Sequence, residues 1–169
     1  MKDADAVRNV ARILQLFPND QLIVVISAMG KTTNALERLI DAFFYKKEDP
    51  RPLLEEIREF HLKIAAGLFP DRSHKIYEDI HNTLVELEWA IEDEPTHTYD
   101  CEYDQVVSVG ELLSTKIVSA YLASAGVKNK WWDVRDFIKT DNTCIYSTNF
   151  RSNLFTGEPN DISRYTGSA

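Results

Sequence analysis

The sequence contains few of the residues that break or cross-link a chain. Among its 169 residues, six are glycine, six are proline and two are cysteine. This composition argues against collagen-like, low-complexity and disulfide-scaffold proteins. The chain also lacks a secretory signal pattern and an apolar run approaching about 18 residues, the length that crosses a bilayer. We therefore expect a globular protein in the cytoplasm, with no membrane partner.

Positive charge and metal ligands are scarce as well. Nineteen Lys and Arg residues face 27 Asp and Glu residues, which gives a net charge of −8. This charge argues against nonspecific binding of nucleic acid and against attraction to anionic membranes. The cysteines lack C-x-x-C spacing, and the histidines lack accompanying cysteines or paired carboxylates; these residues are Cys101, Cys144, His61, His74, His81 and His97. We predict no metal site.

The most informative stretch covers residues 22–34. It opens with five apolar, mostly β-branched residues at 22–26. Such a short, continuous run predicts a strand buried on both faces of a parallel sheet. A turn of small residues then leads into an apolar-periodic segment that predicts a helix. Ligands of open α/β sheets bind at the carboxyl ends of the strands, so this turn is a candidate site.

The turn is rich in hydroxyl groups. Ser27, Thr32, Thr33 and Asn34 suit an anionic ligand at a helix N-terminus, and they equally suit helix capping. The residues Gly-Lys-Thr at 30–32 invite a comparison with phosphate-binding P-loops. That motif requires a glycine at position 25, which is valine here, so we reject the P-loop interpretation.

Helical periodicity covers most of the remaining chain. It predicts helices over residues 3–17, 36–44, 53–68, 74–92 and 100–125, and a short strand over 130–134. The third and fourth helices predict a hairpin of about residues 50–95 that is added to the sheet. Residues 142–169 are rich in Asn, Ser, Thr and Gly without a period, and we expect them to form a loop or a disordered tail.

Two further clusters carry polar groups. Gly110 lies inside a helical pattern, where glycine costs about 1 kcal/mol relative to alanine, and this indicates close approach of a ligand or another backbone. Glu111 follows it, and by itself would be a surface acid. The charged residues within 133–141 lie at the end of a predicted strand. Ion pairs at such surface positions contribute little to stability.

Three motifs in these regions resemble those of aspartate kinases, in the amino-acid kinase family. They are Ser-Ala-Met-Gly-x-x-Thr-Asn at 27–34, Gly-Glu-x-x-Ser at 110–114, and Asp-x-Arg-x-x-Ile-x-Thr-Asp at 133–141. The resemblance implies a three-layer α/β/α sandwich with a mostly parallel sheet, here incomplete. It also implies transfer of the ATP γ-phosphate to the β-carboxylate of L-aspartate with Mg²⁺, the first step toward lysine, threonine and methionine.

The resemblance further implies roles for particular residues. Ser27 and Thr33 match the family positions that contact aspartate, and Glu111 matches the glutamate that binds its amino group. Residues that help to shape the pocket would be Asn34, Gly110, Arg135 and Asp141.

Parts of the family pattern have no counterpart in this chain. Missing are the Lys-Phe-Gly-Gly-Thr-Ser loop, with the catalytic lysine, and a later Gly-Arg-Gly-Gly-Ser-Asp segment. We therefore expect residues 1–141 to be a partial catalytic domain without an assigned catalytic residue, which by itself binds neither ATP nor Mg²⁺ and has little activity. Two alternatives remain open: a kinase of another small carboxylate, and a non-catalytic helical interaction module. A homo-oligomer or a complementary chain are candidate partners.

Overall fold

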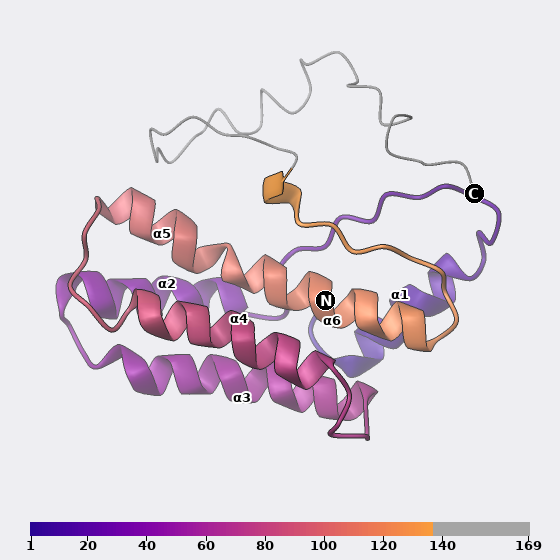
Figure 1. Ribbon diagram of the computed structural model, residues 1–169, viewed down its shortest axis with the longest axis horizontal. Coiled ribbons are helices and arrows are strands. Elements are labelled where there is room, and N and C mark those ends of the chain that lie inside the picture. The colour runs from indigo at the N-terminus through magenta and orange to yellow at the C-terminus, as the bar shows by residue number, and fades with distance from the viewer. Residues whose placement is uncertain (137–169) are drawn as a thin grey trace, which may run out of the picture.

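The computed structural model describes residues 1–136, and this part of the chain is a bundle of helices (Figure 1). The helices are α1 (Ala4–Leu14), α2 (Thr32–Tyr45), α3 (Pro50–Leu68), α4 (Ile76–Ala90), α5 (Tyr99–Val107) and α6 (Val109–Ser124), followed by the short 3-10 helix η1 (Val134–Asp136). No strand occurs among the described residues. The predicted α/β/α sandwich with a mostly parallel sheet is therefore wrong for this part of the chain.

The predicted strand at residues 22–26 shows why. The segment has no regular secondary structure, and its side chains face solvent: Ile23 is 74% exposed and Val25 is 91% exposed. A β-branched run favours extended backbone, but a strand exists only where a second segment pairs with its N–H and C=O groups. No described segment provides that ladder. The strand predicted at 130–134 fails for the same reason, and η1 begins at Val134.

Local sequence explains where several helices begin. The Asp3 side chain accepts a hydrogen bond from the Ala6 N–H at 2.9 Å and caps α1. Asp49 caps α3 in the same way by accepting from the Arg51 N–H at 3.0 Å. Pro50 occupies the first position of that helix, where a missing N–H has no cost. The expected helices over 3–17 and 53–68 are therefore confirmed with shifted ends.

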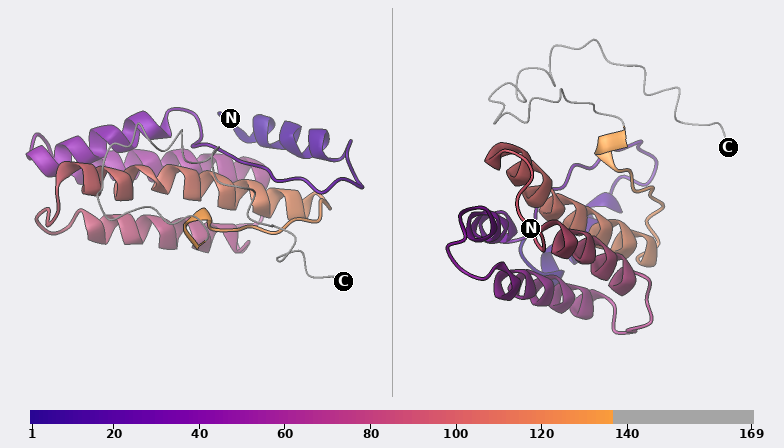
Figure 2. Two further views of the ribbon diagram at one scale, coloured as in Figure 1. Left: turned by 90° about the horizontal axis from the view of Figure 1, so that it is seen from above. Right: turned by 60° about the vertical axis from the view of Figure 1, so that its left-hand side comes forward.

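The central helix of the bundle is α6. It contacts α1, α2, α3, α4 and α5, and α2 and α4 both pack against α3 (Figures 1 and 2). The helical hairpin predicted near residues 50–95 is thus present as α3 and α4. It forms part of the core of the bundle rather than an addition to a sheet. The largest fully buried apolar side chains are Met29, Leu36, Leu39, Ile40, Ile76, Ile80, Leu84, Leu113 and Ile117.

The helix predicted over residues 100–125 is divided at Ser108 into α5 and α6. Together, Tyr99–Ser124 are long and apolar enough to cross a membrane, with a mean hydropathy of 1.3 over the relevant window. The segment is not an uninterrupted apolar run, because Glu111 and Lys116 lie within it, and only its length and mean hydropathy make it a candidate. In the structure the α6 half packs on five other helices, as the core helix of a globular domain does.

Candidate functional site

The turn between the exposed segment and α2 is built around Gly30. Gly30 has φ of +58°, which is in the left-handed region that favours glycine. Its N–H donates to the Met1 carbonyl at 2.7 Å. A Cβ atom at this position would lie 2.9 Å from Cζ of Phe60 on α3. Both the backbone conformation and the Phe60 ring therefore require glycine here.

Helix α6 approaches the same turn from another direction. A Cβ atom on Gly110 would lie 3.0 Å from Cβ of Ala28 and 3.3 Å from Cγ2 of Thr32. It would also lie 3.1 Å from Cδ1 of Leu36. Gly110 is therefore the point at which α6 meets the side chains of Ala28 in the turn and of Thr32 and Leu36 in α2.

Polar side chains of α6 fasten the turn beside this contact. The Ala28 N–H donates to Oε1 of Glu111 at 3.3 Å, and the Ser114 hydroxyl donates to the Ser27 carbonyl at 2.9 Å. Glu111 is half-buried and its Oε2 atom has no hydrogen-bond partner among the described residues. Part of this carboxylate thus remains available to a cation.

The N-terminus of α2 forms the opposite side of the site. The residue before the helix is Lys31, which makes no side-chain capping bond, and the first turn contains no acidic residue. Uncapped N–H groups and the helix dipole make such an end attractive to anions. Thr33 lies in this first turn and is half-buried, whereas Lys31 and Asn34 are exposed.

The structure brings three of the predicted residues to one place. Ser27 and Thr33 flank the turn, and Glu111 touches it through the Ala28 N–H. Arg135 is not joined to them, since its side-chain hydrogen bonds to the described residues all go to Asp133. These bonds lower the pKa of the Asp133 carboxyl. Asp141 and the predicted tail at 142–169 lie outside the described residues.

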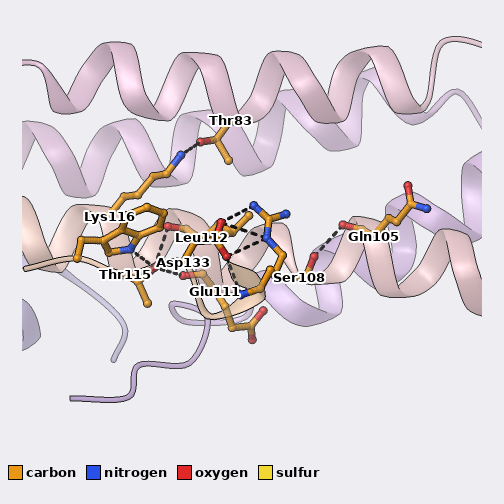
Figure 3. A network of polar contacts seen from close by, with 10 residues as sticks. Thr83, Gln105, Ser108, Glu111, Leu112, Thr115, Lys116 and Asp133 are labelled. Atoms are coloured by element: carbon orange, nitrogen blue, oxygen red, sulfur yellow. Dashed lines mark hydrogen bonds and ion pairs between the residues drawn. The ribbon is translucent and has the colours of Figure 1, made fainter. Parts of the chain in front are cut away.

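A polar network that includes the Glu111 carbonyl holds the segment before η1 on α6 (Figure 3). The Trp131 indole N–H donates to the Thr115 hydroxyl at 3.0 Å, and Lys116 Nζ lies 5.6 Å from the centre of the Trp131 ring. Lys116 also donates to Thr83 on α4 at 2.7 Å. In Figure 3 the Glu111 carboxylate points away from Lys116. Glu111 therefore faces the turn without that lysine as a partner.

Two residues lie behind the turn: Thr32, one of the hydroxyl residues predicted for it, and His61, whose place beside the turn is not evident from the sequence. Thr32 is buried, and its hydroxyl donates to the Met29 carbonyl at 2.6 Å. His61 on α3 is 0% exposed, and its Nε2 atom lies 3.5 Å from the Thr32 hydroxyl. Burial lowers the pKa of His61. The position of His61, four residues after Ile57 and three before Ile64, places it on the apolar stripe of α3 and indicates its burial.

The described residues contain no group of three or more His, Cys, Asp or Glu side chains that could hold a metal ion. The site therefore offers one carboxylate, several hydroxyls and a helix N-terminus. These groups match a small zwitterion better than a metal–nucleotide complex.

Comparison with known proteins identifies the family. The model of the amino acid kinase family matches residues 1–166. This chain belongs to the amino acid kinase family. It is 31% identical over 150 residues to the Arabidopsis thaliana protein named aspartokinase 2, chloroplastic. The matched region covers 84% of this chain and 26% of that protein.

Further relatives agree with this family assignment. The Arabidopsis thaliana aspartokinase 1, chloroplastic, is 33% identical over 82% of this chain and 25% of its own length. The Escherichia coli bifunctional aspartokinase/homoserine dehydrogenase 2 is 25% identical over 83% of this chain and 17% of its own length. The chain thus spans about a quarter or less of these curated relatives. No solved structure matches it significantly. The resemblance to the amino acid kinase family that the sequence motifs indicated is confirmed.

Proposed function

We propose that this chain binds L-aspartate as the acceptor-substrate part of an aspartate kinase. The complete reaction is ATP-dependent phosphorylation of the aspartate β-carboxylate to 4-phospho-L-aspartate. Support comes from the family match and from relatives that are named aspartokinases. The expected location is the cytoplasm, although the Arabidopsis relatives are named chloroplastic.

The observation that carries the proposal is the contact between Glu111 and the turn that leads into α2. The Ala28 N–H donates to Glu111 Oε1 at 3.3 Å, so an anionic group and a helix N-terminus lie on two sides of one short turn. L-Aspartate carries an ammonium group and two carboxylates. Its ammonium group pairs with Glu111, and a carboxylate accepts hydrogen bonds from the hydroxyls of Ser27 and Thr33.

The described residues do not fit ATP with Mg²⁺. They contain no cluster of metal ligands, and Lys31, the lysine of the Gly-Lys-Thr sequence, is exposed. We therefore assign no step of phosphoryl transfer to residues of this chain. The chain alone is expected to release little or no ADP from ATP in the presence of aspartate.

Calorimetric titration tests the role of Glu111 most sharply. L-Aspartate and succinate have the same two carboxylates, and only aspartate carries the ammonium group. Wild type should bind aspartate more tightly than succinate, and Glu111→Gln should lose most of this preference. A charge-assisted hydrogen bond contributes about 1.5–3 kcal/mol, so we expect the aspartate affinity to fall by roughly one to two orders of magnitude.

Glu78→Gln is the matched control, because Glu78 is exposed in the first turn of α4 and its side chain makes no hydrogen bond to another described residue. This variant should bind aspartate like wild type. Equal binding of aspartate and succinate by wild type contradicts the proposed recognition of the ammonium group. Preferential binding of L-glutamate would indicate a kinase of another small carboxylate. Absence of binding to all of these compounds favours the non-catalytic interaction module.

A further inference from the structure

Helix α3 supports the turn with two consecutive side chains. The ring of Phe60 packs on Gly30, where a Cβ atom would come within 2.9 Å of the ring. The neighbouring His61 is fully buried and reaches Thr32 at the start of α2. The ring centroids of Phe60 and His61 lie 5.2 Å apart in an edge-to-face arrangement. Together these residues form the wall of the turn opposite Gly110.

Hydrogen bonding determines the orientation of the His61 ring. Its Nδ1 atom lies 2.8 Å from the Ile57 carbonyl, and because a carbonyl only accepts, Nδ1 carries the proton. The Nε2 atom of the neutral ring is then an acceptor that faces the Thr32 hydroxyl at 3.5 Å. No charged side chain is among the causes that shift the pKa of His61, which are burial and the Ile57 carbonyl.

The Thr32 hydroxyl connects this ring to the turn. It donates to the Met29 carbonyl at 2.6 Å, and the Thr32 N–H donates to the same carbonyl at 3.0 Å. The hydroxyl has a single proton, which the shorter distance assigns mainly to the Met29 carbonyl, so its contact with Nε2 of His61 at 3.5 Å is a weak secondary interaction. All three residues are buried, so water does not compete for these contacts.

We propose that His61 is a positioning residue that acts through Thr32 to fix the turn carrying Ser27 and Thr33. His61 itself does not touch the substrate. This inference rests on the proposed function, because it assigns the turn to the binding of L-aspartate. It adds a buried support on α3 that the three sequence motifs do not contain.

The test compares variants that keep or remove each polar group. Thr32→Ser keeps the hydroxyl, whereas Thr32→Val removes it at nearly constant shape. His61→Gln keeps a polar group directed toward Thr32, and His61→Phe keeps only the ring. We expect Thr32→Val to weaken L-aspartate binding roughly threefold to tenfold, the range of one buried hydrogen bond, and His61→Phe to weaken it by less, because its contact with the hydroxyl is the longer one. Thr32→Ser and His61→Gln should retain more of the affinity.

A double-mutant cycle separates positioning from general stability. If His61 acts through Thr32, the variant with both Thr32→Val and His61→Phe binds aspartate no more weakly than Thr32→Val alone. Thr83→Val is the matched control, since Thr83 is also a buried threonine but lies on α4 and bonds to Asp79 and Lys116. It should leave the affinity for aspartate unchanged. Additive losses in the cycle, or an equal loss in Thr83→Val, overturn the proposal.

Failure of the proposed function is recognised separately. Amide hydrogen exchange of residues 30–33 reports the order of the turn without any ligand. His61→Phe and Thr32→Val should accelerate this exchange while the exchange of α4 amides stays constant. If wild type does not bind aspartate but the exchange behaves as expected, the proposed substrate is wrong and the positioning role stands. Unchanged exchange in both variants refutes the positioning role.

Discussion

The contact between α6 and the turn can be tested with the substitution Gly110→Ala. Two effects oppose each other at this position. Alanine favours a helix interior over glycine by about 1 kcal/mol. The added methyl group would lie 3.0 Å from Cβ of Ala28 and 3.1 Å from Cδ1 of Leu36, and both neighbours must move. Overpacking of this kind typically costs about 1–3 kcal/mol.

The steric cost should exceed the gain in helix propensity. One obstructing atom is a Cβ, which moves only with its backbone, and that backbone carries the Ala28 N–H that donates to Glu111. We therefore expect a net loss of about 1 kcal/mol in the free energy of unfolding, or about 3 °C in melting temperature for a chain of this size. Because the turn is displaced, the loss in the free energy of aspartate binding should exceed the loss in the free energy of unfolding.

Urea denaturation followed by circular dichroism at the helix band measures the stability, and calorimetry measures binding. Gly67→Ala is the matched control, because Gly67 is also in a helix and its Cβ would approach a single atom, Cβ of Ala4, at 3.0 Å. Because Ala4 lies on α1 and not on the turn, Gly67→Ala should leave aspartate binding unchanged. A Gly110→Ala variant that is more stable than wild type and binds aspartate normally would refute the reasoning.

Three further predictions follow from burial and pKa shifts. The pKa of His61 is lowered in the folded chain, so the unfolded chain binds more protons below about pH 6.5. The free energy of unfolding should therefore fall as the pH decreases below that value. In urea titrations, the free energy of unfolding of His61→Phe should fall less over the same pH range. Arg135→Gln should raise the pKa of Asp133 toward its usual value, because the hydrogen bond from Arg135 is the largest cause of its lowering; a carbonyl-detected NMR titration measures this, and an unchanged pKa contradicts the assignment. Val25→Ser should change the free energy of unfolding by less than about 0.5 kcal/mol, because Val25 is 91% exposed; a loss above about 2 kcal/mol in urea denaturation would indicate that the segment is buried as a strand.

Helical periodicity in the sequence was sufficient to predict most of the bundle. Apolar spacing located α1, α2, α3 and α4 because each of these helices buries one face, a property encoded within a single segment. Strands could not be predicted in the same way. Whether residues 22–26 form a strand depends on a pairing segment elsewhere, and composition does not reveal whether that segment is present.

The candidate site was predictable to a similar extent. Gly110 gave a physical indication of close packing, and the sequence motifs pointed to Glu111, Ser27 and Thr33. The support behind the turn cannot be predicted from the sequence, since Thr32 equally suits an anionic ligand or helix capping, and His61 suggests only a metal ligand, which has no accompanying ligands. Its apolar neighbours Ile57 and Ile64 indicate burial, but its contact with Thr32 depends on tertiary packing.

The most direct test of this account is a titration of the ¹⁵N-labelled chain with L-aspartate, followed by amide chemical shifts. We predict saturable shifts that concentrate in residues 27–34 and 110–114, with little change along α4. The same titration of Glu111→Gln should need a much higher concentration of aspartate to reach the same shifts. Well-dispersed spectra that do not respond to aspartate, or shifts spread evenly over the surface, would contradict the account.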